Sequence, residues 1–384
     1  MDTLRSSSHK PFWCGGFLKI ILADLLVCTS FYMFLPLFPE LLWGVGTPEE
    51  QACLYAGLLF CAGVLLPAPC CNYWMDVYRR KGVALRALAY FTVVVALMQL
   101  GLPLWVKLLS WFLAGSAWSV FQIALGSTLL LDLSQSEQRT EAAHIYYWFS
   151  RLALVFGTLL ARLVPVRDAG YSYLLFSLAF LVAAWLLVFS LSVPFRAPLN
   201  PSLFSLDRFW LPRGVRLFIP VLLVSAFAGL SLGCVREAES GLFLGAGFLT
   251  ALIVHRHLFK DCMQAEVISG FVLLLVSCVA FGWFSEFYMG RAVSVCVLGA
   301  GLGFTASRFL LAFIRICEHC ERGTAQTSCW LGWEIGLVSG FMLAFALREN
   351  HRHALVLLSV IFVVSAFFSY LFGVRKWYVA HRRK

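Results

Sequence analysis

Apolar stretches of about twenty residues recur along the whole chain, and this feature restricts the possible folds more than any other. A helix needs about 20 apolar residues to cross ~30 Å of hydrocarbon. Only 13% of the 384 residues are charged, against roughly 25% in soluble domains. Inside a bilayer the backbone polar groups must be bonded within the protein, so segments of this kind cross as helices. The sequence therefore predicts an all-α polytopic membrane protein.

Twelve transmembrane helices account for the apolar stretches and leave only short loops. The predicted spans are Gly16–Leu37, Gln51–Pro69, Val83–Leu102, Val106–Leu131, Ala142–Val164, Tyr171–Val193, Val215–Val235, Glu239–Val254, Val267–Gly282, Tyr288–Ile314, Ala325–Leu347 and Ala354–Val374. The longest polar break follows the sixth span. We therefore expect an N-terminal six-helix half (residues 1–193), a cytoplasmic linker (194–214) and a C-terminal six-helix half (215–384).

The distribution of Lys and Arg orients the predicted helices. With the N-terminus inside, the inner segments carry about three times as many Lys and Arg as the outer loops. This places both termini in the cytoplasm and accounts for the net charge of +10. Nucleic-acid binding needs one contiguous basic face, whereas these residues are divided among seven segments, so no nucleic-acid partner is expected. The first span is too long for a signal peptide. We expect an integral protein of the cell (inner) membrane, present as a monomer.

The sequence indicates neither an enzyme nor a cofactor. Most of the 13 cysteines fall within predicted helices, where Cys acts as a small apolar residue. The pair Cys317 and Cys320 in "CEHC" has no second pair to complete a zinc site. The P-loop and H-E-x-x-H patterns are also missing from the sequence. We therefore expect no catalytic residues, no metal and no cofactor.

An internal repeat relates the fifth and eleventh predicted helices. Three positions recur at one constant spacing of 183 residues: Arg139, Arg151 and Gly157 correspond to Arg322, Glu334 and Gly340. Each set begins in the loop before its helix and places a charge about three turns inside it. Internal repeats are frequent in transporters. The spacing therefore predicts two pseudo-symmetric halves.

A short charged segment between the second and third predicted helices, "NYWMDVYRRK", carries a family resemblance. It is similar to the G-x-x-x-D-[RK]-x-G-[RK]-[RK] signature of the major facilitator superfamily. Asp76, Arg80 and Lys81 match, while Asn72 and Arg79 replace the two glycines. Together with the twelve-helix topology, the chain resembles a compact bacterial-type transporter of that family. The family's proline motif near Gly157 is missing.

The resemblance implies a cytoplasmic gate motif. Asp76 would lie against the start of the eleventh helix, close to the backbone of residues 324–327, and Arg80 and Lys81 would pair with nearby acids. The alternative for the basic residues is that they only hold the loop inside. For Asp76 the gate is favoured, because a carboxylate stabilises a helix N-terminus and does nothing for positive-inside topology.

Four charged residues lie within predicted helices, roughly 10–15 Å from the inner ends: Asp24, Arg151, Arg308 and Glu334. Charged side chains at such depth usually face the bundle interior and have a partner or a function. Their matched depths predict pairing of Asp24 with Arg151, and of Glu334 with Arg308. With Gln122, on the fourth helix, they form the predicted substrate and proton site. Structural salt bridges are the alternative.

These features favour a secondary active transporter that moves a small organic solute by alternating access, with transport coupled to protons through Glu334. The expected partners are the solute, protons and the lipid bilayer. The substrate and the direction of transport stay open. A non-transporting membrane protein or a lipid scramblase on the same fold is the alternative. A hydrated centre around Glu334 and Arg151 favours transport, and a centre filled by side chains favours the alternative.

Overall fold

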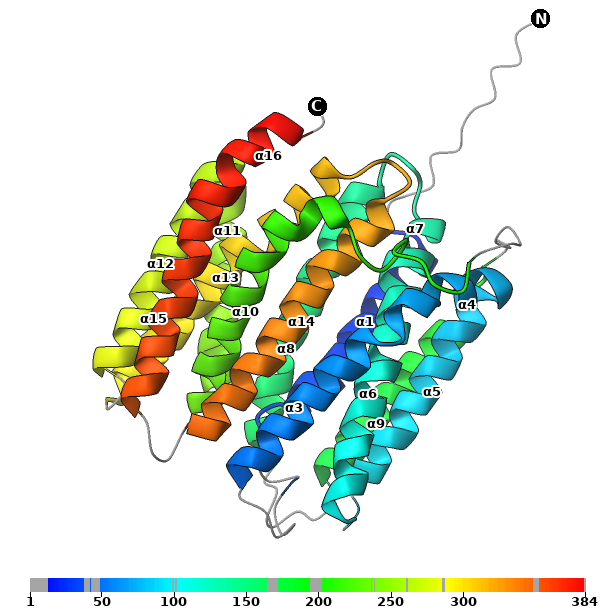
Figure 1. Ribbon diagram of the computed structural model, residues 1–384, viewed down its shortest axis with the longest axis horizontal. Helices are drawn as coiled ribbons and strands as arrows, with labels where there is room; N and C mark the ends of the chain where they lie inside the picture. Colours follow the sequence, from blue (N-terminus) through cyan, green and yellow to red (C-terminus); the bar gives the residue numbers. More distant parts are fainter. Residues whose placement is uncertain are drawn as a thin grey trace, which may run out of the picture.

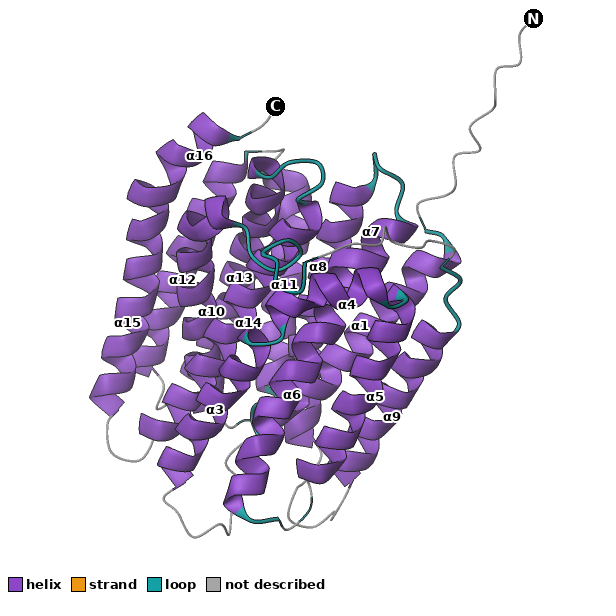
Figure 2. Cartoon of the chain, turned by 45° about the vertical axis from the view of Figure 1, so that its right-hand side comes forward, coloured by secondary structure: helices purple, strands orange, loops and turns teal. Residues whose placement is uncertain are grey.

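A computed structural model describes residues 13–37, 42, 49–98, 100, 102–163, 172–193, 202–235, 237, 239–259, 262–284, 287–347 and 352–382. All regular elements in these ranges are helices, as Figure 2 shows. Before the linker they are α1 (Gly15–Phe34), α3 (Glu49–Leu65), α4 (Cys71–Val77), α5 (Arg80–Met98), α6 (Leu104–Ala124), α7 (Leu130–Leu133), α8 (Arg139–Leu163) and α9 (Ser172–Phe189). After it come α10 (Val215–Cys234), α11 (Ser240–Leu258), α12 (Met263–Phe284), α13 (Tyr288–Ile316), α14 (Arg322–Leu347), α15 (Arg352–Phe368) and α16 (Arg375–His381).

Membrane-spanning capacity follows from the length and composition of these helices. Within the described ranges, nine helices are long and apolar enough to cross a membrane, and two shorter ones, Tyr173–Phe189 and Ser240–His255, are also apolar. Helix α8 is long enough but carries several charged residues, which lowers its mean hydropathy. An all-helical membrane protein is therefore confirmed. The count of twelve spans and the sidedness of the termini stay predictions.

The segment that carries Asp76 is helical, although the sequence predicted a loop there. The second predicted span was expected to end at Pro69, but α3 ends earlier, at Leu65. Pro67 and Pro69 lack a backbone N–H and interrupt the α-helical hydrogen bonds, and a single 3₁₀ turn bridges the break. The chain then resumes as α4, which ends at Val77. Asp76 is consequently fixed on the last turn of a helix.

The helices before and after the linker pack mainly among themselves (Figure 1). Helix α1 lies against α8 and α9, and α6 lies against α3 and α5. After the linker, α14 lies against α10, and α13 lies against α11 and α12. Between the two groups, α14 packs on α3 and α11 packs on α8. Helices α8 and α14 therefore line the boundary between the groups.

The predicted repeat coincides with observed helix starts and helix contacts. Helices α8 and α14 begin at Arg139 and Arg322, the two positions separated by 183 residues. A Cβ at Gly157 of α8 would come 2.7 Å from the Tyr32 Cβ of α1. A Cβ at Gly340 of α14 would collide with the Ala226 carbonyl oxygen of α10. Each glycine thus lets its helix approach the first helix of its own group closely.

The two groups touch at both ends of the bundle. At the end that carries the linker, hereafter the linker face, a Cβ at Gly323 would come 2.6 Å from the Ser127 carbonyl oxygen. At the other end, hereafter the far face, the Arg162 guanidinium donates to the Val235 carbonyl at 2.8 Å. A Cβ at Gly241 there would come 2.7 Å from the Leu159 Cβ. The two groups are therefore in contact at both faces of the described bundle.

Candidate functional site

Asp24 of α1 lies in a compact group of hydrogen-bond donors at the centre of the bundle. Its Oδ1 accepts from the Tyr146 hydroxyl at 2.7 Å, the Gln122 amide at 2.9 Å and the Cys28 thiol at 3.4 Å. The Tyr146 hydroxyl also lies 3.0 Å from the Gln122 Oε1. Asp24 is fully buried. Donors from α1, α6 and α8 therefore hold this carboxylate in place of the predicted partner Arg151.

Arg151 of α8 lies between the two groups of helices, and only 1% of its side chain is exposed. The guanidinium carbon lies 3.8 Å from the ring centroid of Trp333 and 4.0 Å from that of Tyr147. Its Nη1 is 3.7 Å from the Glu334 Oε1, an ion-pair distance that is too long for a hydrogen bond. Among the described residues, none of its three guanidinium nitrogens has a hydrogen-bond partner. Arg151 is thus held by aromatic faces and by charge.

Glu334 of α14 receives its contacts from helices of the other group. The Tyr32 hydroxyl of α1 donates to its Oε1 at 2.6 Å, and Arg151 of α8 faces the same oxygen. The side chain is fully buried. Within the described part of the chain, the other oxygen, Oε2, has no hydrogen-bond partner. Glu334 therefore joins α14 to both α1 and α8, so separating the two groups must rearrange these contacts.

The predicted pairing of the four charges is wrong. Glu334 lies beside Arg151, whereas Arg308 donates from its Nε to Glu266 of α12. The Arg308 Nη2 also lies 3.0 Å from the His255 Nδ1, and that nitrogen lies 3.0 Å from the Glu266 Oε1. The cause is the predicted boundary at Val267, which left Glu266 outside a helix. Matched depth alone gave no information on which side of each helix the charges lie.

A small pocket adjoins the central charges on their linker-face side. It is lined by residues of α6 and its π-helical continuation (Leu125–Leu129), of α8, and of α14. Tyr147 and Ser150 of α8 face Trp330 and Gln326 of α14 across it. Its volume is about 10 Å³, which is about the size of one water-sized probe. Among the described residues, this pocket therefore leaves room for little more than a water molecule between α6, α8 and α14.

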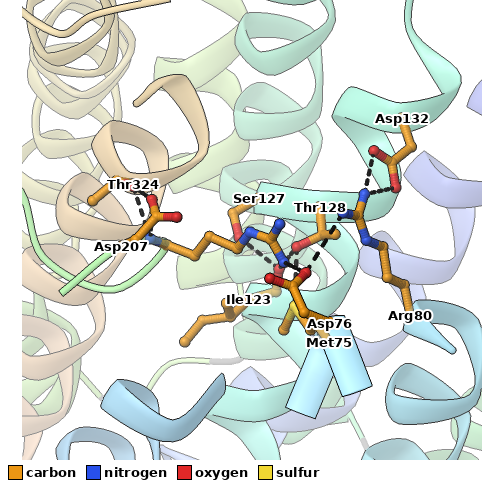
Figure 3. A network of polar contacts seen from close by, with 10 residues as sticks. Met75, Asp76, Arg80, Ile123, Ser127, Thr128, Asp132, Asp207 and Thr324 are labelled. Carbon is orange, nitrogen blue, oxygen red and sulfur yellow. Dashed lines mark hydrogen bonds and ion pairs between the residues drawn. The ribbon is translucent and has the colours of Figure 1, made fainter. Parts of the chain in front are cut away.

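Asp76 and Arg80 of the gate motif belong to a connected polar network at the linker face (Figure 3). Arg80 of α5 donates to the Asp132 carboxylate of α7 at 2.6 Å and lies 3.7 Å from Asp76. Asp76 accepts from the Arg208 Nη1 at 3.0 Å, and Arg208 belongs to the linker. Lys81 instead donates to the Leu191 carbonyl at 2.7 Å. The expected acidic partners are thus present for Arg80, and the expectation is wrong for Lys81.

The linker continues this network to the first turn of α14. The Arg208 backbone N–H donates to the Thr324 hydroxyl at 2.8 Å, and that hydroxyl donates to the Asp207 carboxylate at 3.0 Å. Figure 3 shows Asp207 beside Thr324 at the left, and Asp76 between this pair and Arg80 with Asp132 at the right. Direct approach of Asp76 to residues 324–327 was predicted, but Asp76 and Thr324 are joined through Arg208. The linker is therefore a bridge between the gate motif and α14.

Sequence reasoning missed the aromatic and hydroxyl partners of the buried charges. Tyr147 precedes Arg151 by four residues on α8, a helical spacing that places both on one face, so it was recognisable in principle. Trp333 directly precedes Glu334 in the sequence. Tyr32 and Tyr146 carry no comparable local signal, because their partners lie far away in sequence. Within the described ranges, no three His, Cys, Asp or Glu residues are grouped so as to hold a metal ion.

No protein-family model and no curated protein matches the sequence. Solved structures do match it along most of its length. The POT family transporter PepTSo is 11% identical with a TM-score of 0.70, covering 97% of this chain and 100% of its own. The human organic anion transporter MFSD10 (TETRAN) is 14% identical with a TM-score of 0.65, covering 92% and 99%. The nucleoside transporter NupG is 13% identical with a TM-score of 0.65, covering 96% and 100%. The chain therefore has the fold of the major facilitator superfamily transporters.

Proposed function

We propose that the protein is a secondary transporter that moves a small organic solute across the membrane by alternating access, with transport coupled to protons. Residues 1–193 and 215–384 form the two moving halves in this proposal, and the linker joins them. The observation that carries it is the position of Glu334 and Arg151. They face each other across the boundary between the two groups of helices, inside a fold that the compared transporters share.

The geometry supports a proton-dependent cycle. Moving a charge into the membrane interior costs several kcal/mol, so buried ionised groups remain paired when the structure closes. Glu334 is paired with Arg151 and with the Tyr32 hydroxyl in this structure. A proton on Glu334 removes its charge and with it the attraction to Arg151. Protonation therefore frees the guanidinium at the point where a solute must bind.

The experiment compares Glu334→Gln with the parent protein in proteoliposomes. A thermal-shift screen of the purified chain first identifies a solute that stabilises it. The variant keeps the shape of the side chain but cannot take up a proton, so solute exchange should persist while uptake driven by a pH gradient is lost. Wild-type uptake by Glu334→Gln would exclude Glu334 from the coupling.

A lipid scramblase or a non-transporting protein is the second candidate, because the pocket beside the central charges has room for little more than a water molecule. The same proteoliposomes decide between them. They are loaded with a fluorescent phospholipid, and an impermeant reductant reports how much of it reaches the outer leaflet. Rapid lipid exchange without solute exchange supports the scramblase. Solute exchange without lipid exchange supports transport.

A further inference from the structure

Hydrogen-bond donors without acceptors gather around Arg151. The three guanidinium nitrogens have no hydrogen-bond partner among the described residues, and neither have the indole nitrogens of Trp330 and Trp333. Trp333 lies against the guanidinium, and Trp330 lines the adjoining pocket. A guanidinium presents five N–H donors in a planar fork that fits a carboxylate with two parallel bonds. The site therefore offers more donors than the protein's own acceptors use.

The two buried acids differ in how well they are already satisfied. One oxygen of Asp24 receives three hydrogen bonds, which stabilise its ionised form without help from a ligand. Glu334 receives one, from Tyr32, and lies 3.7 Å from Arg151. Each acid also keeps one oxygen without a hydrogen-bond partner, but in the cluster of Asp24, Arg151 and Glu334 only Arg151 has no hydrogen bond to any of its polar atoms within the described structure. The ligand group that meets this need is an anion of the size of the Glu334 carboxylate.

The net charge of Asp24, Arg151 and Glu334 favours a ligand with a single negative charge. With Asp24 and Glu334 ionised, the empty cluster carries a net charge of −1, because Arg151 supplies one positive charge. With Glu334 protonated and one carboxylate ligand bound, the net charge is again −1. A change of net charge in the membrane interior is costly, and this exchange avoids it. A zwitterion or a cation bound to the protonated cluster would change the net charge.

We propose that the solute is a monocarboxylate with an apolar or aromatic body, and that its carboxylate replaces that of Glu334 at Arg151. This inference rests on the proposed transport function and specifies its substrate class. A proton from the aqueous phase binds the Glu334 carboxylate, which leaves Arg151, and the solute carboxylate then accepts two parallel hydrogen bonds from one edge of the guanidinium. The rings of Tyr147, Trp330 and Trp333 contact the apolar body. Carboxylate and proton cross together, and the transport is electroneutral.

Four probes with one phenyl ring and different charged groups test the class: benzoate, phenyl phosphate, benzylamine and phenylalanine. The melting temperature of the purified full chain is measured with each at pH 6 and pH 8, and benzoate is accompanied by monocarboxylates of larger apolar bodies. We expect the monocarboxylates to raise the melting temperature by at least about 2 °C at pH 6 and less at pH 8, since binding requires a protonated Glu334. The other three probes should give no comparable shift.

Two variants assign the effect to the cluster. Arg151→Gln should abolish the shift, while the matched control Arg213→Gln should preserve it, because Arg213 is exposed and pairs with exposed Glu318. Glu334→Gln should bind monocarboxylates equally at both pH values, which gives an independent test if Arg151→Gln does not fold. In proteoliposomes, uptake of the monocarboxylate with the largest shift should follow the pH gradient and ignore the membrane potential.

Each contrary result has a defined meaning. Stabilisation and exchange with benzylamine or phenylalanine, without monocarboxylates, would overturn the substrate class and leave the transport function intact. Equal binding of phenyl phosphate would overturn the selection of a single charge. Monocarboxylate shifts that persist in folded Arg151→Gln would exclude the guanidinium. Absence of any shift or exchange together with lipid flipping would overturn the transport function itself.

Discussion

At the scale of single residues, the ion pairs Arg151–Glu334 and Arg308–Glu266 are both buried, but they are built differently. Arg308 donates a hydrogen bond to Glu266 on a neighbouring helix of its own group. Arg151 faces Glu334 across the boundary between the groups, at 3.7 Å and without a hydrogen bond. A direct charge-assisted hydrogen bond is stronger than a longer ion pair. The Arg308 pair is therefore suited to hold a structure together, and the Arg151 pair to exchange partners.

Charge removal should show this difference. Arg308→Gln or Glu266→Gln alone leaves a buried charge without its partner, a loss that costs about 3–5 kcal/mol, and the double variant should recover much of it. For Arg151 and Glu334 we expect a smaller coupling, because other groups already contact both side chains. The melting temperatures of the single and double variants are measured in two double-mutant cycles, one for each ion pair. Equal coupling energies in both cycles would contradict a special role for the Arg151 pair.

Sequence predicted which residues are buried and charged but not how they pair. Hydropathy and helix rise give the depth of Asp24, Arg151, Arg308 and Glu334, since both depend only on position along a helix. Pairing depends on rotation about each helix axis and on which helices are neighbours. The hydrogen bonds of Asp24 with Gln122 and Tyr146 join positions about 100 residues apart. A single sequence contains no record of such contacts.

At the scale of elements, the linker joins two structural units, and one of its residues has a strained backbone. Arg208 has φ of 59°, in the left-handed region that a residue with a Cβ enters at a cost of roughly 1–2 kcal/mol. Its backbone N–H donates to Thr324 and to Asp207, and its guanidinium donates to Asp76. These bonds hold the backbone in that conformation. The linker thus has a defined structure between the gate motif and α14.

Two substitutions of Arg208 distinguish the effect of its strained backbone from the effect of its side-chain hydrogen bond. Arg208→Ala keeps the strained backbone and loses the bond to Asp76, so it should lower the stability of closure at the linker face by about 1 kcal/mol. Arg208→Gly loses the same bond but relieves the strain, so it should be the more stable of the two. Impermeant maleimide labelling of Thr327→Cys, in a chain without other cysteines, reports the opening. Labelling should be faster in both variants than in the parent.

For the fold as well, features set by the local sequence were predicted, and contacts between residues distant in sequence were not. Long apolar stretches predicted the helices well, because a spanning helix requires them whatever its neighbours are. The prolines Pro67 and Pro69 predicted that the helix ends, but not that a new helix, α4, begins within two residues of Pro69. Proline shows only that a helix is interrupted. The contact between the linker and α14 had no sequence signal, because Asp207 and Thr324 lie more than 100 residues apart.

At the scale of the whole molecule, the contacts between the groups at both faces depend on small residues at their boundary. Gly323 lets the first turn of α14 lie against the π-helical turn that contains Ser127. Gly241 lets the start of α11 lie against Leu159 near the end of α8. Neither position has space for a side chain. Alternating access requires that each contact opens while the other stays closed.

Valine substitutions at Gly323 and Gly241 therefore form a matched pair, each of which adds a side chain that pushes one face apart. Gly323→Val should open the linker face and leave the far face closed, and Gly241→Val should do the opposite, because in each case the added methyl groups meet a neighbour that the Cβ alone would approach within 2.7 Å. Spin labels at Ser136 and Cys320 report the linker face, and labels at Leu163 and Leu242 report the far face. The distance at the face that carries the valine should lengthen beyond the distribution of the parent. If both substitutions lengthened the same distance, or if both distances lengthened together, the two faces would not alternate, and a transporter of this type would be excluded.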